Sequence, residues 1–276
     1  MHTTIVRTLK WEYRIRTQSR EVAELMAFVD TRPEMVGFEL ETLELSVESD
    51  SDRHSLALPD GTIAEGTALD IIDGVARVVY LGIEVEEPAA PLIHGASVVI
   101  GGQKVLLVGV AGFGKTTLTM HLLANGIDVE GDEHIVVREQ DVVARPRPLR
   151  VKSASIALLP KLAAAVLASP SLLVREGDRT YSVYSVAPSI TGRPWRIAAG
   201  RADHVVFLEP NHGGKSELAP LPREAAFGRL MEDCLLPGGN HGTAVARVRR
   251  AAAESCTWLL RLGDLAEAEW LIRNLP

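Results

Sequence analysis

Short segments of alternating apolar and polar residues occupy the first third of the chain. Alternation with a period of two is typical of strands with one face in the core, whereas apolar residues three and four positions apart indicate a helix. Ser19 is a candidate N-cap followed by helical spacing, which predicts a helix over 19–29. The strands predicted in this part are 13–16, 38–47, 55–58 and 75–81. Asp60-Gly61 predicts a turn after the strand 55–58.

The pattern changes after residues 86–91, whose sequence EEPAAP resembles a linker. The apolar run 105–108 predicts a buried parallel strand, and residues 94–100 are expected to pair with it as a hairpin through Gly101-Gly102. Leucines at helical spacing predict a helix over 115–125 that stops at a glycine, a common C-terminal cap. Further strands are predicted over 127–130, 135–138, 204–208 and 257–260, and further helices over 155–167, 223–232 and 265–273.

Together these elements predict an α/β protein with two domains. Residues 1–88 are expected to form a small N-terminal α+β domain. Residues 89–276 are expected to form a larger domain on a central, partly mixed sheet flanked by helices. The length of 276 residues suffices for one large domain or two modest ones.

A glycine-rich segment, GVAGFGKT, matches the phosphate-binding motif G-x-x-x-x-G-K-[ST] in full. It lies between a predicted strand and a predicted helix, which is the setting that the motif requires; the alternative is a chance glycine-rich turn that joins a strand to a helix. Backbone N–H groups then surround a di- or triphosphate at the positive end of the helix. Lys115 is expected to reach the β- and γ-phosphate oxygens, and the Thr116 hydroxyl to hold Mg²⁺. The residues predicted to bind a nucleoside triphosphate are Gly109, Val110, Ala111, Gly112, Phe113, Gly114, Lys115, Thr116 and Thr117.

Composition and charge narrow the possible partners. The net charge is −7 with no basic stripe, which argues against nucleic acid as a main partner. No apolar run reaches the roughly 18 residues that a membrane helix needs, and the N-terminus has no apolar signal region, so a cytoplasmic location without membrane contact is expected. Cys234 and Cys256 are expected to be buried free thiols.

Several polar residues near the motif are candidates for chemistry. Asp132-Glu133 follows the predicted strand 127–130, at the sheet edge where α/β proteins bind ligands. Phosphoryl transfer to a hydroxyl needs a group that accepts the proton, and an acid at this edge could do so, although a solvated acidic turn is the alternative. His94 could orient Asp132 or contact phosphate, or be a structural histidine. Three basic residues could meet phosphate oxygens or an acidic peptide, or form a solvated loop: Arg145, Arg147 and Lys152.

At this point the motifs resemble a known family. His94-Gly95, the hairpin, GVAGFGKT, the helix ending at Gly126 and Gly131-Asp132-Glu133 are similar to the catalytic domain of bacterial HPr kinase/phosphorylase. The similarity is greater still to its shortened relatives, the HPr-kinase-like proteins of gene clusters for modified peptides such as lasso peptides. The HPr enzyme has Gly-Lys-Ser and Asp-Asp where this chain has Gly-Lys-Thr and Asp-Glu. The resemblance extends over about residues 91–152, including the basic segment RPRPLRVK.

The resemblance implies a P-loop kinase fold of the HPr kinase and PEP-carboxykinase type, with ATP and Mg²⁺ as cofactors. It implies that Asp132 is the general base and that His94 assists it. It also implies that Lys115 binds phosphates, and that Thr116, with Glu133 as a candidate, serves Mg²⁺. The HPr enzyme has a later glycine-rich signature that begins with a metal-binding glutamate, whereas the sequence after Lys152 here is SASIALLPKLAAAV. Neither phosphorolysis nor HPr as the substrate is therefore implied, and one metal ligand stays unassigned.

Three functions remain open from the sequence. The leading one is a kinase that phosphorylates a serine or threonine hydroxyl on a peptide or small protein. In that case the N-terminal domain could dock the substrate, with the strand 38–47 adding a leader peptide by edge pairing. The second is a kinase of the same fold for a metabolite hydroxyl. The third is a nucleotide-dependent switch without transfer, for which Val205–Glu209 could be the Walker-B strand. A homo-oligomer is possible, but no residue fixes an interface.

Overall fold

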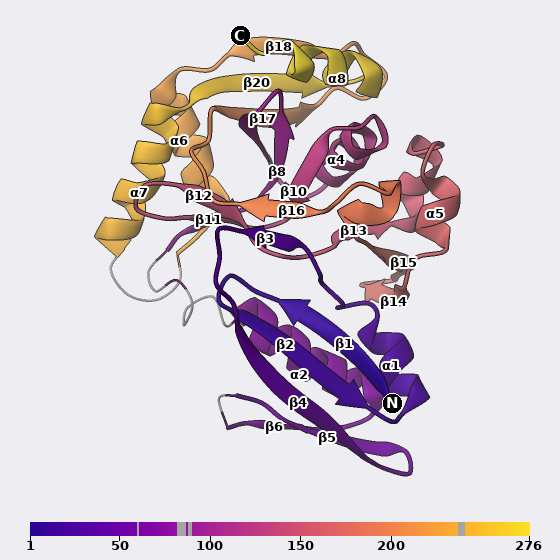
Figure 1. Cartoon of the computed structure of the whole chain (residues 1–276). Coiled ribbons are helices and arrows are strands. Elements are labelled where there is room, and N and C mark those ends of the chain that lie inside the picture. The colour runs from indigo at the N-terminus through magenta and orange to yellow at the C-terminus, as the bar shows by residue number, and fades with distance from the viewer. Residues whose placement is uncertain (60, 82–86, 88–89, 237–240) are drawn as a thin grey trace.

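The chain folds into an N-terminal unit, residues 1–81, and a larger α/β part that lies above it in Figure 1. The computed structural model describes residues 1–59, 61–81, 87, 90–236 and 241–276. The predicted linker at 86–91 and the turn at Asp60-Gly61 therefore lie partly outside the described residues. Within the described parts, no helix is both long and apolar enough to cross a membrane.

A five-stranded sheet in the order β1-β2-β4-β5-β6 forms the N-terminal unit, together with two helices. Its hydrophobic cluster is separate from those of the rest of the chain, and Ile15, Met26, Leu56 and Ile71 are fully buried in it. The elements are β1 (His2–Arg7), β2 (Trp11–Thr17), α1 (Arg20–Met26), β4 (Glu41–Asp50), β5 (Arg53–Ala57), β6 (Ile63–Gly66) and α2 (Ala68–Leu81).

One prediction for this unit is wrong, and another is confirmed only in part. Residues 75–81 are part of α2 rather than a strand, because the buried Ala68, Ile71, Ile72 and Val75 follow the helical period that the shorter window hid. The predicted strand 38–47 begins only at Glu41, and β4 lies between β2 and β5 in the sheet. Each half of β4 has one printed partner, β2 for residues 41–46 and β5 for residues 47–50, so edge pairing of a leader peptide through this strand stays a prediction.

The larger part is built on a mixed six-stranded sheet in the order β10-β8-β9-β17-β20-β18. Strands β9, β17 and β20 run parallel, whereas β10, β8 and β18 are antiparallel to their neighbours. The predicted hairpin, the strand at 105–108 and the helix after the glycine-rich segment are confirmed. The bounds are β8 (Gly95–Ile100), β9 (Gln103–Val108), α4 (Lys115–Ala124), β10 (Asp128–Gly131), β17 (His204–Pro210), β18 (Glu217–Pro220) and β20 (Cys256–Leu262).

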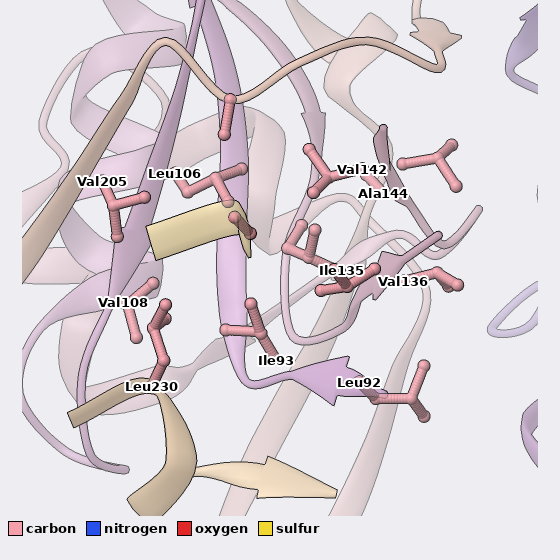
Figure 2. Close-up of a cluster of buried hydrophobic side chains, with 14 of the residues drawn as sticks. Leu92, Ile93, Leu106, Val108, Ile135, Val136, Val142, Ala144, Val205 and Leu230 are labelled. Carbon is pink, nitrogen blue, oxygen red and sulfur yellow. The ribbon is translucent and has the colours of Figure 1, made fainter. Parts of the chain in front are cut away.

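Each face of this sheet has its own core, because successive residues of a buried strand point to opposite sides. One face of the sheet, which carries Leu106 and Val108 of β9 and Val205 of β17, packs against a second sheet, β12-β11-β7-β19, and the helices α6 and α7. Figure 2 shows these three side chains in one cluster with side chains of β7, β11, β12 and α6. Val105 and Leu107 face α4 and α8 on the other side. The bounds are β7 (Leu92–Ile93), β11 (Ile135–Val137), β12 (Val142–Ala144), α6 (Arg223–Glu232), β19 (Cys234–Leu235), α7 (His241–Glu254) and α8 (Leu265–Arg273).

A three-stranded sheet, β13-β15-β14, lies beside α5 and connects the core to the N-terminal unit. The helix predicted over 155–167 is divided into a 3-10 helix, η1, and the short α5. Pro160 explains the division, because a proline lacks an N–H donor and disfavours helical backbone at the residue before it, here Leu159. The bounds are β13 (Leu149–Lys152), η1 (Ser153–Leu158), α5 (Ala163–Leu167), β14 (Ser171–Glu176), β15 (Arg179–Val186) and η2 (Pro188–Thr191).

The N-terminal unit joins the larger part through a parallel pair of short strands, β3 (Glu34–Val36) and β16 (Arg196–Ala198). An ion pair between Arg196 and Glu34, at 2.7 Å, accompanies this pairing. The cysteines differ from expectation: Cys256 is exposed and Cys234 is only partly buried, although both thiols are free.

Candidate active site

The glycine-rich segment forms a loop between the end of β9 and the start of α4. Two of its glycines have positive φ, 90° at Gly112 and 87° at Gly114, a region that other residues rarely adopt. Gly114 is the N-cap of α4, and a Cβ there would lie 2.9 Å from Leu262 Cδ2. The sequence folds in this way because β9 is buried and the glycines allow a sharp turn into the helix.

Lys115 points back into this loop. Its ammonium group donates hydrogen bonds to the carbonyl oxygens of Gly109 and Val110, and only 6% of the residue is exposed. Burial lowers the pKa of the ammonium group, against the opposing charges of Asp132, Asp233 and Glu133. The side chain therefore places a cation at the loop.

Asp132 is the carboxylate that contacts the loop. Thr116 Oγ1 donates a hydrogen bond of 2.6 Å to Asp132 Oδ2, which joins the first turn of α4 to the residue after β10. Asp132 is 6% exposed, and burial raises the pKa of its carboxyl group, while the hydrogen bond from Thr116 opposes that rise. A buried acid with a raised pKa in a cleft is a common property of functional sites.

Glu133 has an unusual backbone for a residue other than glycine, with φ of 85°. In this conformation its N–H donates to Asp132 Oδ1 at 2.9 Å, and its carbonyl oxygen accepts from the N–H of Gly95 at 3.3 Å. Its carboxylate forms an ion pair with Arg147. The strained backbone thus orients Asp132, whereas the Glu133 side chain has a basic partner.

Two histidines lie beside these acids. The rings of His94 and His134 are edge to face, with centroids 6.4 Å apart. Burial, together with the charge of Lys115, lowers the pKa of His94. Burial lowers the pKa of His134 to about 4, and Glu133 opposes this shift. Both imidazoles are consequently neutral near pH 7 and able to accept as well as donate a hydrogen bond.

A pocket of about 300 Å³ brings most of the predicted residues together. Its lining includes His94, Asp132, Glu133 and Lys152. The loop contributes Ala111, Gly112, Gly114, Lys115, Thr116 and Thr117.

Five predicted residues do not line this pocket: Gly109, Val110, Phe113, Arg145 and Arg147. The carbonyl oxygens of Gly109 and Val110 hold Lys115, and Phe113 packs against the core. Arg145 is buried, with its backbone N–H bonded to the carbonyl oxygen of His134. Arg147 holds Glu133. Direct contact of these two arginines with a ligand in the pocket is therefore not supported.

Three residues near the site were not predicted. Arg150 and Ser155 line the pocket, and the negative charge of Asp233 acts on both Lys115 and His94. Asp233 follows α6, and its carbonyl oxygen accepts from the N–H of His94 at 3.4 Å. Arg150 had a signal in the sequence, because strand alternation places it on the same face as Lys152.

The oxygen ligands available for Mg²⁺ are few. Among the described residues, no group of three or more histidine, cysteine, aspartate or glutamate side chains is arranged to hold a metal ion. The Thr116 hydroxyl and the Asp132 carboxylate meet at the pocket, and hard oxygen ligands of this kind fit Mg²⁺, which usually keeps water and phosphate oxygens as its other ligands. The pairing of Glu133 with Arg147 makes Glu133 less available.

Comparison with solved structures finds a distant similarity to the HPr(Ser) kinase/phosphatase from Coxiella burnetii. The two chains are 13% identical with a TM-score of 0.32, and the alignment covers 66% of this chain and 94% of that one. No family model matches the chain, and neither does any curated protein. A likeness at this level carries no argument about activity, so the proposals below depend on the geometry of the site.

Proposed function

We propose that this chain is an ATP- and Mg²⁺-dependent phosphotransferase that phosphorylates a hydroxyl group. The observation that carries the proposal is the 2.6 Å contact between Thr116 Oγ1 and Asp132 Oδ2. It places a buried carboxylate against the first turn of the helix that follows a complete phosphate-binding motif. A phosphate donor and a proton acceptor would thus meet in one pocket.

In this proposal the loop amides and Lys115 bind the phosphates of the donor, and Lys115 exchanges its carbonyl partners for phosphate oxygens. Asp132 accepts the proton of the acceptor hydroxyl as the oxygen attacks the γ-phosphorus. The bond between the γ-phosphorus and the bridging oxygen breaks, and ADP leaves. His94, kept neutral by its surroundings, helps to hold the orientation of Asp132.

Mg²⁺ would neutralise charge on the phosphates and align the γ-phosphoryl group. Thr116 is the first residue suited to hold it, and Asp132 supplies the nearest carboxylate oxygens. Glu133 would take part only after its ion pair with Arg147 opens.

The acceptor proposed is a serine or threonine of a peptide or small protein, as in the biosynthesis of modified, lasso-type peptides. This part of the proposal follows from the sequence motifs that resemble HPr-kinase-like proteins. A metabolite hydroxyl is the alternative acceptor. Transfer of ³²P from [γ-³²P]ATP, measured separately in a serine- and threonine-containing peptide library and in a metabolite fraction, distinguishes the two.

The test of the mechanism is Asp132→Asn. Loss of a general base slows transfer by about 10²- to 10⁴-fold, whereas affinity for a non-hydrolysable ATP analogue should change only a few-fold. Asp128→Asn is the matched control, because Asp128 lies at the start of β10 with an exposed side chain and pairs with Arg193. Transfer at the wild-type rate by Asp132→Asn would contradict the assignment.

A nucleotide-dependent switch is a second candidate, because β17 lies parallel to β9, directly beside the strand that leads into the loop. A Walker-B strand occupies a position of this kind, and β17 carries Glu209 near its end, paired with Arg229 at 2.6 Å. A switch predicts ATP hydrolysis without a phosphorylated acceptor, and a Glu209→Gln variant that binds ATP but hydrolyses it slowly. Transfer to an acceptor that is unaffected by Glu209→Gln would instead favour the phosphotransferase.

A further inference from the structure

A pair of basic side chains on β13 forms one wall of the pocket. Leu149 and Val151 of this strand are fully buried, so the alternating residues Arg150 and Lys152 share its other face. Both line the pocket together with the phosphate-binding loop, and so does Ser155 of η1. Two cations and a hydroxyl group on one wall are a set that binds an oxyanion.

Arg150 is held in place by the N-terminal unit. Its guanidinium carbon lies 3.8 Å from the centroid of the Phe28 ring, and its Nη1 donates to the Phe28 carbonyl oxygen at 2.8 Å. Ser185, the partner of Arg150 across the β13–β15 pair, donates to the same carbonyl oxygen at 2.6 Å. Stacking and hydrogen bonding together fix the plane of the guanidinium group, which reduces the entropy lost when it binds an anion.

The other basic groups near the site have different positions. Lys115 is bonded to the carbonyl oxygens of the loop, and Arg147 is paired with Glu133. Lys152 is more exposed and lies 3.7 Å from Glu176, beside the ring of Tyr181. Arg150 is therefore the pocket-lining cation with the most rigid placement on this wall.

We infer that Arg150, Lys152 and Ser155 form a second oxyanion subsite in the pocket, with Phe28 as the positioning residue for Arg150. Its ligand is a phosphate or carboxylate group. This inference rests on the proposed nucleotide site, because both share the pocket. The oxyanion belongs either to the terminal phosphate of the donor or to an acidic group of the acceptor beside the reacting hydroxyl. Because Phe28 belongs to the N-terminal unit, its positioning of Arg150 gives that unit a direct role at the site.

The test uses the full chain and isothermal titration calorimetry with Mg²⁺ present. The probes are ADP, a non-hydrolysable ATP analogue, and inorganic phosphate added to the ADP-saturated protein. Arg150→Gln should weaken binding of the oxyanion by about 10- to 100-fold, since a hydrogen-bonded charge is lost. Lys152→Gln should weaken it by only about 2- to 5-fold, because that side chain is exposed. ADP affinity should stay the same in both variants.

The arms of this experiment distinguish the two sources of the oxyanion. Weaker binding of the ATP analogue, with ADP unchanged, assigns the subsite to the donor's terminal phosphate. Weaker binding of inorganic phosphate, with both nucleotides unchanged, assigns it to the acceptor. Either result supports the subsite.

The positioning role of Phe28 is tested by the affinity for the oxyanion relative to the affinity for ADP, because a general structural defect would lower both. Phe28→Leu should weaken the same oxyanion as Arg150→Gln while leaving ADP affinity unchanged, and Phe28→Tyr, which keeps the ring, should restore the binding. Arg175→Gln is the matched control, an exposed arginine on β14 of the same sheet. If Arg150→Gln does not fold, Arg150→Lys serves instead, since it keeps the charge but loses the planar group.

Unchanged binding of both the ATP analogue and phosphate in the Arg150 variants would overturn the inference. So would an equal loss of affinity for ADP and for the oxyanion, because that pattern indicates a general defect. None of these measurements depends on phosphate transfer. A protein that binds the oxyanion through Arg150 but phosphorylates nothing would refute the proposed function alone.

Discussion

Replacing Asp132 by asparagine should make the protein more stable even though it removes the proposed base. The carboxylate is buried, and burial raises its pKa, so the ionised form costs folding free energy. An amide of the same shape keeps both hydrogen bonds. Its oxygen accepts from the N–H of Glu133, and its NH₂ group donates to the Thr116 hydroxyl, which turns to accept.

The expected change in the free energy of unfolding follows from the burial of the charge. Each unit by which burial raises the pKa of an acid corresponds to about 1.4 kcal/mol of folding free energy at a pH where the group is ionised, and a neutral amide does not carry this cost. The attraction between Asp132 and Lys115 is lost, which reduces the gain. We therefore expect Asp132→Asn to raise the free energy of unfolding by about 1–3 kcal/mol at pH 8, the usual size of a single-substitution effect.

The pH dependence gives a sharper test than the magnitude. Because the pKa of Asp132 is higher in the folded protein than in the unfolded chain, the folded carboxyl group binds its proton more tightly. The wild type then loses stability as pH rises through the folded pKa, and the variant does not. The difference between the two proteins should be small near pH 4 and largest at pH 8.

Urea denaturation at both pH values, with a chelator present to remove divalent ions, measures this difference. The m-value should be the same for the two proteins. Asp128→Asn, at an exposed ion pair, should change stability by less than about 0.5 kcal/mol. A less stable Asp132→Asn protein, or a gain that does not vary with pH, would refute the reasoning about burial.

Two further predictions concern the loop and the thiols. Gly114→Ala should lower the free energy of unfolding by about 1–3 kcal/mol and weaken nucleotide binding, because φ is positive there and the new methyl group meets Leu262. Gly101→Ala is the control: its φ is also positive but a Cβ there has no neighbour within 4 Å, so only the backbone strain should lower its stability. Thermal unfolding of both variants tests this. Burial raises the pKa of Cys234 to about 11, so at pH 8 its thiol should react with Ellman's reagent about 30- to 100-fold more slowly than the thiol of the exposed Cys256. Variants in which one of the two cysteines is replaced by serine measure each rate separately. Equal rates would contradict the burial of Cys234.

Long periodic segments were predictable from the sequence. The helices 223–232 and 265–273 have the predicted bounds, because their apolar positions follow the helical period without interruption. α7 was missed although its buried residues 244, 248, 251 and 252 show the same spacing. The two-residue strands β7 and β19 could not be predicted, since so short a segment has no period and exists only through its pairing partners.

The residues of the candidate site were predictable where they lie close together in the sequence. The loop carries its own motif, and Asp132 follows a recognisable strand, so the sequence alone singled them out. Alternation along 149–152 places Arg150 on the same face as Lys152, but only the long-range pairing of β13 with β15 positions that face. Asp233 lies at the end of α6, which no local pattern connects to the site. Arg145 and Arg147 shared the basic character of that segment, but they precede the strand, and alternation does not carry their side chains into the pocket.

The chain buries a second acid in a very different way. Glu130 on β10 forms an ion pair with Lys104, and its carboxylate also accepts from the Ser97 hydroxyl at 2.6 Å and from the N–H of Ala198 at 3.2 Å. Lys104 in turn donates to the Ala198 carbonyl oxygen at 2.9 Å. Both charges are satisfied by neighbours within the fold, as expected for a structural pair.

Asp132, Lys115 and His94 are compensated less fully. Asp132 and Lys115 each make two hydrogen bonds, but within the described part of the chain neither forms an ion pair at salt-bridge distance. Burial is the largest influence on all three, and in each case it moves the pKa towards the neutral form. Folding alone would favour apolar residues at these positions, as it favours a fully paired acid at Glu130. An anionic donor with its cation would supply the missing charges and relieve the cost, because a ligand that binds only the folded state stabilises it. The contrast between Glu130 on β10 and Asp132 just after this strand is therefore a physical argument for the proposed chemistry at Asp132 rather than at Glu130.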